Sequence, residues 1–283
     1  MTETLADRTM LVRLSISSWS AKKSDRKAGD KLSADSHAER KMVNAVKRLI
    51  SCDALDKYNA LANVARQYHN RYTMPWEDDG VRILPVRIFE EYMTQMAKYK
   101  EGLDRAVDKF IETYDDEVRY QEARLGSLFD PKDYPTKDGL RAKFKFDMAR
   151  RPVPTGKDFR LDMQSEAMQE LQVEVEERLQ AAHDTALRDI WQRAYDTVNN
   201  LYERMSNVTS PLRTNTLENV KDITKVLDAL NFADDPDISK INEEIRLKFC
   251  SKDINSLRND PVARTDAADE AQRMLNKMSG YFN

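Results

Sequence analysis

The sequence predicts a mainly α-helical protein: a long antiparallel helical hairpin of coiled-coil type, a small β-hairpin or three-stranded β element at its tip, and a C-terminal helical bundle. Helix is favoured because the 283 residues include only 7 Gly and 9 Pro, too few turn formers for a many-stranded sheet. Two stretches of about 40 residues also carry apolar side chains at spacings of three and four, the period of a helix face. We expect three successive parts: strand and helices (1–86), the hairpin with a basic β-tip at 127–161 (87–207), and the bundle (208–283).

The N-terminal part begins with a strand. Val12, Leu14 and Ile16 alternate with other residues over 11–17, which is the period of a half-exposed strand. Residues 20–37 are polar but compatible with helix, so we expect a solvated helix there.

Helical spacing continues in the rest of this part. Met42, Val46 and Leu49 lie three and four residues apart and predict further helical turns. Residues 54–72 predict a helix with a broad apolar face. A turn and a brief extended piece follow at 77–85, where an Asp-Gly dipeptide marks the turn.

The two long helices are expected at 88–125 and 162–205, with Gly126 ending the first and Asp162 capping the second. A helix of this size is roughly 57 Å long at about 1.5 Å per residue, too long for a compact bundle. Antiparallel pairing is therefore the simplest arrangement. The same apolar stripe can pair within one chain or across a dimer axis, so a homo-oligomer stays open.

The intervening segment predicts a β-hairpin with a basic rim. Phe144, Phe146 and Phe159 alternate with charged residues on either side of a Pro-rich turn. A two-stranded ribbon is marginally stable alone, so we expect it to recruit the strand at 11–17.

The C-terminal part predicts three helices. Asp235-Pro236 and Asp260-Pro261 each place proline just inside a helix start. The expected helices form a small bundle and span 215–230, 237–249 and 261–278.

Charge is distributed unevenly along the chain. The net charge is -3, yet residues 8–48 hold eleven Lys or Arg against four Asp or Glu (+7), and residues 132–160 hold nine against four (+5), which leaves -15 for the remainder. Segregation of this size bears on the choice of partner rather than on the fold.

The motifs exclude the familiar catalytic and metal sites. Cys52 and Cys250 lie far apart, and the three histidines lack metal-ligand spacing. The Thr155-Gly156-Lys157 sequence departs from a phosphate loop, which needs an earlier Gly and a following Ser or Thr. We therefore expect no enzymatic activity, no metal and no cofactor. Few cysteines, no signal-like N-terminus and no membrane-length apolar run favour a reducing cytoplasm, without membrane association.

Basic and aromatic residues supply the candidate contact surface for a partner protein or nucleic acid. The candidates are Lys143, Lys145, Arg150, Arg151, Lys157 and Arg160, together with Trp19 and Trp76. Basic side chains that interleave with aromatic ones are typical of nucleic-acid ribbons. The competing interpretation is that the phenylalanines form the buried face of a hairpin and the charges its solvated face. Both tryptophans are likewise explained as core anchors.

Several stretches resemble the phage and bacterial family known as domain of unknown function (DUF) 3150. They are LVRLSISSWSAKKSDRKA at 11–28, MPWEDDG at 74–80, ILP at 83–85, and RAKFKFD followed by PVP and DFRLDM. The family has no assigned activity and no catalytic residues. The resemblance implies a tailed-phage origin, and hence a host cytoplasm. It also implies association with a MoxR-type AAA+ ATPase and a von Willebrand A-domain protein.

Two functions follow as hypotheses. The first is a non-enzymatic adaptor that joins an AAA+ ATPase or von Willebrand A-domain partner to a substrate. The alternative is a nucleic-acid-binding protein that uses the basic segments 8–48 and 141–160, whose contact with phosphate would release counterions.

Overall fold

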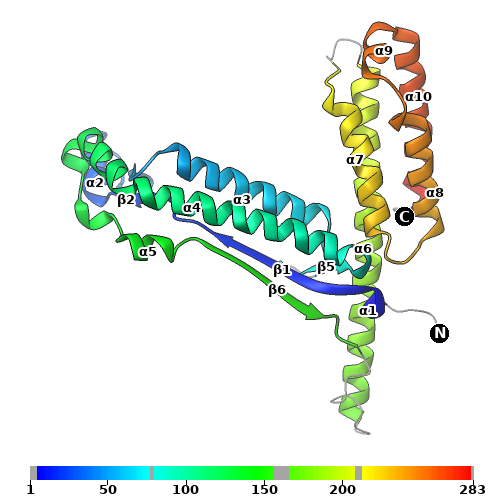
Figure 1. Cartoon of the computed structure of the whole chain (residues 1–283), viewed down its shortest axis with the longest axis horizontal. Helices are drawn as coiled ribbons and strands as arrows, with labels where there is room; N and C mark the ends of the chain where they lie inside the picture. The colour runs from blue at the N-terminus through cyan, green and yellow to red at the C-terminus, as the bar shows by residue number, and fades with distance from the viewer. Residues whose placement is uncertain (1–4, 77–79, 156–165, 208–211, 282–283) are drawn as a thin grey trace. The chain divides into compact units, whose positions relative to one another are not determined.

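The computed structural model describes residues 5–76, 80–155, 166–207 and 212–281 (Figure 1). The chain forms two compact units. Unit 1 comprises Met1–Arg13, Tyr68–Tyr92 and Ala149–Asn283, and unit 2 comprises Leu14–Gln67 and Met93–Met148. The units interleave, whereas the sequence suggested three successive parts, because two strands and two helices each continue from one unit into the other.

Unit 2 contains short elements around two long helices. Its elements are β2 (Lys22–Ser24), α2 (Arg26–Asp35), η1 (Arg40–Met42), β3 (Val46–Arg48), most of α3 (Asp53–Arg71) and α4 (Phe89–Leu125), η3 (Gly126–Leu128), η4 (Pro131–Asp133) and α5 (Lys137–Arg141), with parts of β1 (Thr9–Ser17) and β6 (Lys145–Pro152). Helices α3 and α4 run side by side (Figure 1), and their apolar faces meet at Tyr58, Ala62, Leu103 and Val107.

The helical turns expected from Met42, Val46 and Leu49 are wrong beyond the single turn of η1. Val46 begins strand β3, which pairs with β2. Met42 and Val46 are 76% and 60% exposed, and only Leu49 is buried. Their spacing therefore does not mark one buried face.

Aromatic side chains make the core of unit 2. The ring of Trp19 lies 6.4 Å from Phe110 and 6.1 Å from Tyr114, measured between centroids. Phe144 stands edge-on to Tyr58 at 4.8 Å. Such edge-to-face pairs add to the stabilisation from burial. Trp19 is 8% exposed and is thus a core anchor.

The segment after α4 folds back along that helix. Gly126 takes a left-handed conformation with φ 51°, which glycine adopts without steric cost. Tyr114 then donates a hydrogen bond to the Pro135 carbonyl at 3.0 Å, and Arg141 pairs with Asp108 at 2.6 Å. Strand β6 therefore starts beside the middle of α4, and the expected position of the β element at the tip of a helix pair is not confirmed.

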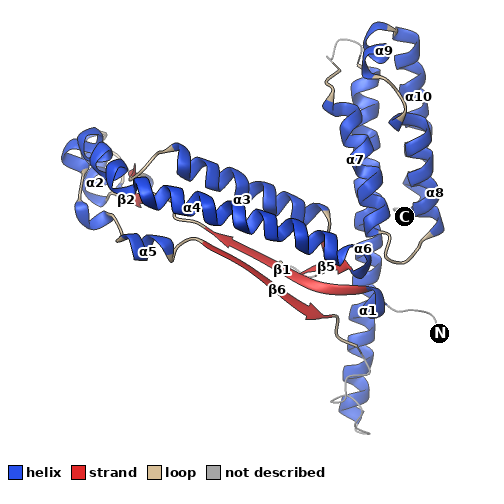
Figure 2. Ribbon diagram, viewed as in Figure 1, coloured by secondary structure: helices blue, strands red, loops and turns tan. Residues whose placement is uncertain are grey.

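The strands form a small antiparallel sheet in the order β4-β5-β1-β6 (Figure 2). Strand β5 (Arg82–Pro85) lies between β4 (Met74–Pro75) and β1. The expected pairing of the N-terminal strand with the basic strand is confirmed, since β1 and β6 are neighbours. The second strand expected near Phe159 lies outside the described residues.

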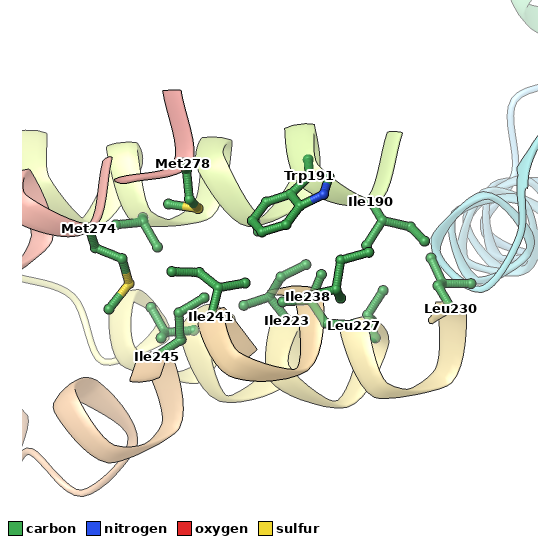
Figure 3. Packing of buried hydrophobic residues seen from close by; sticks show 14 of the residues in the cluster. Ile190, Trp191, Ile223, Leu227, Leu230, Ile238, Ile241, Ile245, Met274 and Met278 are labelled. Carbon is green, nitrogen blue, oxygen red and sulfur yellow. The ribbon is translucent and has the colours of Figure 1, made fainter. Parts of the chain in front are cut away.

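Unit 1 is built on the long helix α6. Its elements are α1 (Leu5–Arg8), β4, β5, η2 (Val86–Ile88), α6 (Glu166–Ser206), α7 (Asn215–Leu230), α8 (Pro236–Ile245), the π-helical η6 (Arg246–Cys250), α9 (Ile254–Asn259), α10 (Pro261–Met278) and η7 (Ser279–Tyr281). Asp235 and Asp260 cap α8 and α10, with Pro in the first turn of each helix. Figure 3 shows part of the unit 1 core, where Trp191 of α6, Leu227 of α7 and Ile241 of α8 pack together.

The antiparallel pairing of the two long helices is not confirmed. Leu103 and Phe110 of α4 are buried within unit 2. Ile190 and Ala194 of α6 are buried in unit 1, in the cluster to which α7, α8 and α10 contribute. Periodicity identifies the apolar face of a helix but does not identify the element that covers it.

Unit 1 also contains a buried polar network around Thr73. His69 Nδ1 lies 2.6 Å from the Tyr92 hydroxyl. Arg82 donates to the Thr73 hydroxyl at 2.6 Å, and Arg193 donates to the Thr73 carbonyl at 2.8 Å. Burial, reinforced by the Arg82 charge, lowers the pKa of His69 to about 4.

This network predicts a pH-dependent stability. The pKa of folded His69 lies below its ordinary 6.5, so the unfolded chain binds the proton more tightly. The free energy of unfolding should therefore fall as the pH drops from 6.5 to 4, by about 3 kcal/mol from this group. In urea unfolding of His69→Gln between pH 6.5 and 4, the free energy of unfolding should decline by about 3 kcal/mol less than in the wild type.

The matched control is His37→Asn, at an exposed position whose left-handed backbone (φ 53°) Asn tolerates. It should keep the wild-type decline. Equal pH profiles for wild type and His69→Gln would contradict the assignment.

Candidate functional site

Residues 20–48 of unit 2 carry a concentration of positive charge, and we call them the basic module. It consists of the β2–β3 ribbon, helix α2 and the η1 turn. It holds nine Lys or Arg against four Asp or Glu, a local charge of +5. The positions of these charges give the β2–β3 ribbon one face that contacts the rest of unit 2 and one face that is exposed.

The ribbon places like charges directly opposite each other. Lys22 pairs with Arg48, and Lys23 pairs with Lys47, in antiparallel register. Like charges that face each other across two strands are destabilising. Side chains alternate between faces along a strand, so the two pairs lie on opposite faces of the ribbon.

One face is neutralised by Asp133 of η4. The Asp133 carboxylate is 3% exposed and contacts the amines of both Lys23 and Lys47, the latter at 2.6 Å. Lys47 also donates to the Leu128 carbonyl at 2.6 Å. Hydrogen bonds from the two amines hold the pKa of Asp133 below its ordinary value. This face therefore attaches the ribbon to the segment that follows α4.

The other face has no such partner. Within the described residues, Lys22 and Arg48 form no ion pair, and Arg48 makes only a 3.4 Å contact with the Ser51 hydroxyl. Val46 shares this face and is 60% exposed. The outer face therefore combines two opposed cations with an exposed apolar side chain.

Helix α2 adds a second unfavourable arrangement. Arg26 and Lys27 occupy its first turn and Asp35 its last position. A helix favours anions at its N-terminus and cations at its C-terminus, so Asp35 at the last position is unfavourable. The start of the helix is already capped by an anion, because the Asp25 carboxylate accepts a hydrogen bond from the Ala28 amide at 3.0 Å.

The other charges of the module are partly paired. Arg40 pairs with Asp30, and Lys41 pairs with Glu39 at 2.7 Å. The cations without an ion pair in the described part of the chain are Lys22, Arg26, Lys27, Lys31 and Arg48.

The contact residues predicted on β6 fit a structural interpretation better. Lys143 and Lys145 are exposed and alternate with the half-buried Phe144 and Phe146, which pack on the unit 2 core. The phenylalanines are thus the covered face, as the competing interpretation held.

Arg150 and Arg151 are exposed near the end of β6, in unit 1 rather than unit 2. Strand β6 is an edge of the described sheet, where charge prevents pairing with other chains. Lys157 and Arg160 lie outside the described residues. Trp76 is half-buried against the unit 1 core, a placement that favours an anchor.

No group of three metal-binding side chains occurs among the residues that the structure describes. Nor does any helix in this part of the chain have the length and apolarity needed to cross a membrane. The two cysteines are free and half-buried.

The family described as "Protein of unknown function (DUF3150)" matches residues 6–250 of the chain. The chain belongs to the DUF3150 family. The match covers the whole basic module and Asp133, and α10 lies beyond it. No curated protein and no solved structure matches the chain.

The geometry of the basic module predicts a specific role for Asp133. Asp133→Asn removes the charge that offsets Lys23 and Lys47, and should destabilise the ribbon by roughly 2 kcal/mol. Amide hydrogen exchange in residues 22–24 and 46–48 should accelerate accordingly.

A suitable control is Asp116→Asn, because that carboxylate on α4 is 73% exposed and, among the described residues, forms an ion pair only with Arg119 three residues away. Exchange in the ribbon should stay at the wild-type rate. If amide exchange in the ribbon were equally slow in both variants, the prediction that Asp133 stabilises the ribbon would be wrong.

Proposed function

We propose that this DUF3150 protein is a non-enzymatic binding protein whose basic module binds nucleic acid. The observation that carries the proposal is the outer face of the β2–β3 ribbon, where Lys22 and Arg48 oppose each other without an acidic partner in the described structure. Such opposition costs stability in the free protein. A ligand that supplies closely spaced negative charges removes that cost.

The form of the module supports a polynucleotide over a single anion. Its unpaired cations are distributed over a ribbon and the start of a helix, which suits a row of phosphates. Two-stranded ribbons fit a nucleic-acid groove. Val46, exposed between the cations, offers an apolar contact to sugar or base.

A charge reversal tests the proposal. The wild-type chain should bind labelled DNA or RNA with an affinity that falls steeply with salt; five phosphate contacts give a slope of roughly -4 to -5 on a log–log plot. Lys22→Glu with Arg48→Glu should abolish binding at physiological salt in fluorescence anisotropy. Arg150→Glu with Arg151→Glu should keep most of it, since those side chains lie on the sheet edge.

The single variant Lys22→Glu separates binding from folding. It turns an opposed like-charge pair into an attractive one, so unit 2 should gain a few tenths of a kcal/mol in stability while affinity falls. Salt-insensitive binding, or loss of binding only in the Arg150 and Arg151 variant, would overturn the proposal.

We also propose a second function, adaptor to an AAA+ ATPase or von Willebrand A-domain protein. The division into two compact units supports it, because unit 1 keeps its own surfaces when unit 2 holds nucleic acid. Co-purification of the chain with such an ATPase should yield a complex that Lys22→Glu with Arg48→Glu leaves intact. Failure to form any complex at micromolar concentrations would rule this function out.

A further inference from the structure

We propose that unit 1 contains a binding site for a small phosphorylated ligand, in a cavity between α6 and α7. The cavity measures about 410 Å³, within the range of small-molecule sites. It is lined by Arg71, Thr197, Asn200, Leu201, Arg204, Thr216, Asn219 and Ile223. All of these residues belong to unit 1.

The lining has the chemistry of an anion site. The lining residues include two arginines, two asparagines and two threonines, and none of them is acidic. Thr197 and Asn200 also donate to backbone carbonyls of α6. Arginine and neutral hydrogen-bond donors are the groups that commonly bind phosphate. The lining contains two positive charges, and Asp222, which pairs with Arg71, offsets one of them.

Both arginines can be recruited by a ligand. Arg204 forms no ion pair within the described residues. Arg71 pairs with Asp222 at 3.3 Å, but the two side chains are 43% and 46% exposed. Exposed pairs of this kind contribute little, so a phosphate can compete for the guanidinium.

Thr216 provides an independent indication of a ligand. The residue lines the cavity and is 5% exposed, yet its hydroxyl has no hydrogen-bond partner in the described structure. A buried polar group without a partner requires an explanation, because most such groups are satisfied. Its oxygen has less than 1 Å² of accessible surface, so a rotation of the side chain toward the cavity would bring it within reach of a phosphate oxygen.

The position of Thr216 favours the same ligand. It is the second residue of α7, a helix of 16 residues, and Thr214 before the helix makes no side-chain capping bond. The dipole of a helix favours an anion near its N-terminus, although the Thr216 amide already donates to the Arg213 carbonyl at 3.0 Å and Glu218 lies in the first turn. Guanidinium groups, a free hydroxyl and a helix start thus meet at one cavity.

The test uses the full chain and defined probes at constant ionic strength. Isothermal titration with adenosine monophosphate, with inorganic phosphate and with uncharged adenosine distinguishes a phosphate site from a site for the rest of a nucleotide. We expect both phosphate-bearing probes to bind and adenosine to be silent. Arg71→Gln with Arg204→Gln should weaken binding by at least about tenfold.

Two threonine variants separate ligand binding from folding. Thr216→Val should reduce phosphate affinity without lowering the melting temperature, because the hydroxyl has no protein partner to lose. Thr224→Val, also buried on α7, removes a hydroxyl that donates to the Lys221 carbonyl at 2.8 Å, and should lower the melting temperature with affinity unchanged.

The outcomes also separate this site from the basic module. Lys22→Glu with Arg48→Glu should leave phosphate binding intact, since those residues belong to unit 2. Phosphate binding that is lost in that variant and kept in Arg71→Gln with Arg204→Gln would overturn the cavity assignment. Absence of binding by either phosphate-bearing probe would overturn it as well.

Discussion

The contact of Asp133 with Lys23 and Lys47 is the interaction on which the arrangement of the basic module depends. A ribbon of two short strands that opposes four cations in two pairs is not stable by itself. One buried carboxylate offsets the inner pair and fixes the ribbon to the segment that follows α4. With Lys23 and Lys47 bound to Asp133 on the inner face, Lys22 and Arg48 remain exposed on the outer face of the ribbon. Structure and the proposed binding surface therefore derive from the same arrangement of charges.

The sequence predicts the elements of this fold more reliably than their partners. The two long helices begin and end close to where periodicity places them, since a face of leucine, alanine and aromatic residues is a local signal. Their burial in different units is not local. Trp19 and Phe144, which lie far from Phe110 along the chain, cover α4, and no spacing within α4 reveals them.

The candidate site shows the same limit. The number of Lys and Arg residues identifies segment 8–48 as basic, but the same count makes the residues of β6 an equally good candidate for the contact surface. The difference lies in register. Lys22 opposes Arg48 only once β2 and β3 pair, and Lys47 contacts Asp25 and also Asp133, which lies 86 positions away in the sequence. The only local signal for a ribbon is two three-residue segments, Lys22–Ser24 and Val46–Arg48. Segments this short do not specify which strand each one pairs with.

The interleaved division of the chain has a consequence for its biosynthesis. Every residue of unit 2 precedes Ala149, whereas unit 1 needs both the first residues and the last helix. A ribosome therefore completes unit 2 while α6 to α10 are still untranslated, an interval of about 10 s at ordinary rates of elongation. During that interval, the apolar residues of β4 and β5 lack the helices that cover them. Unit 1 is thus the part of the nascent chain whose apolar residues stay uncovered longest.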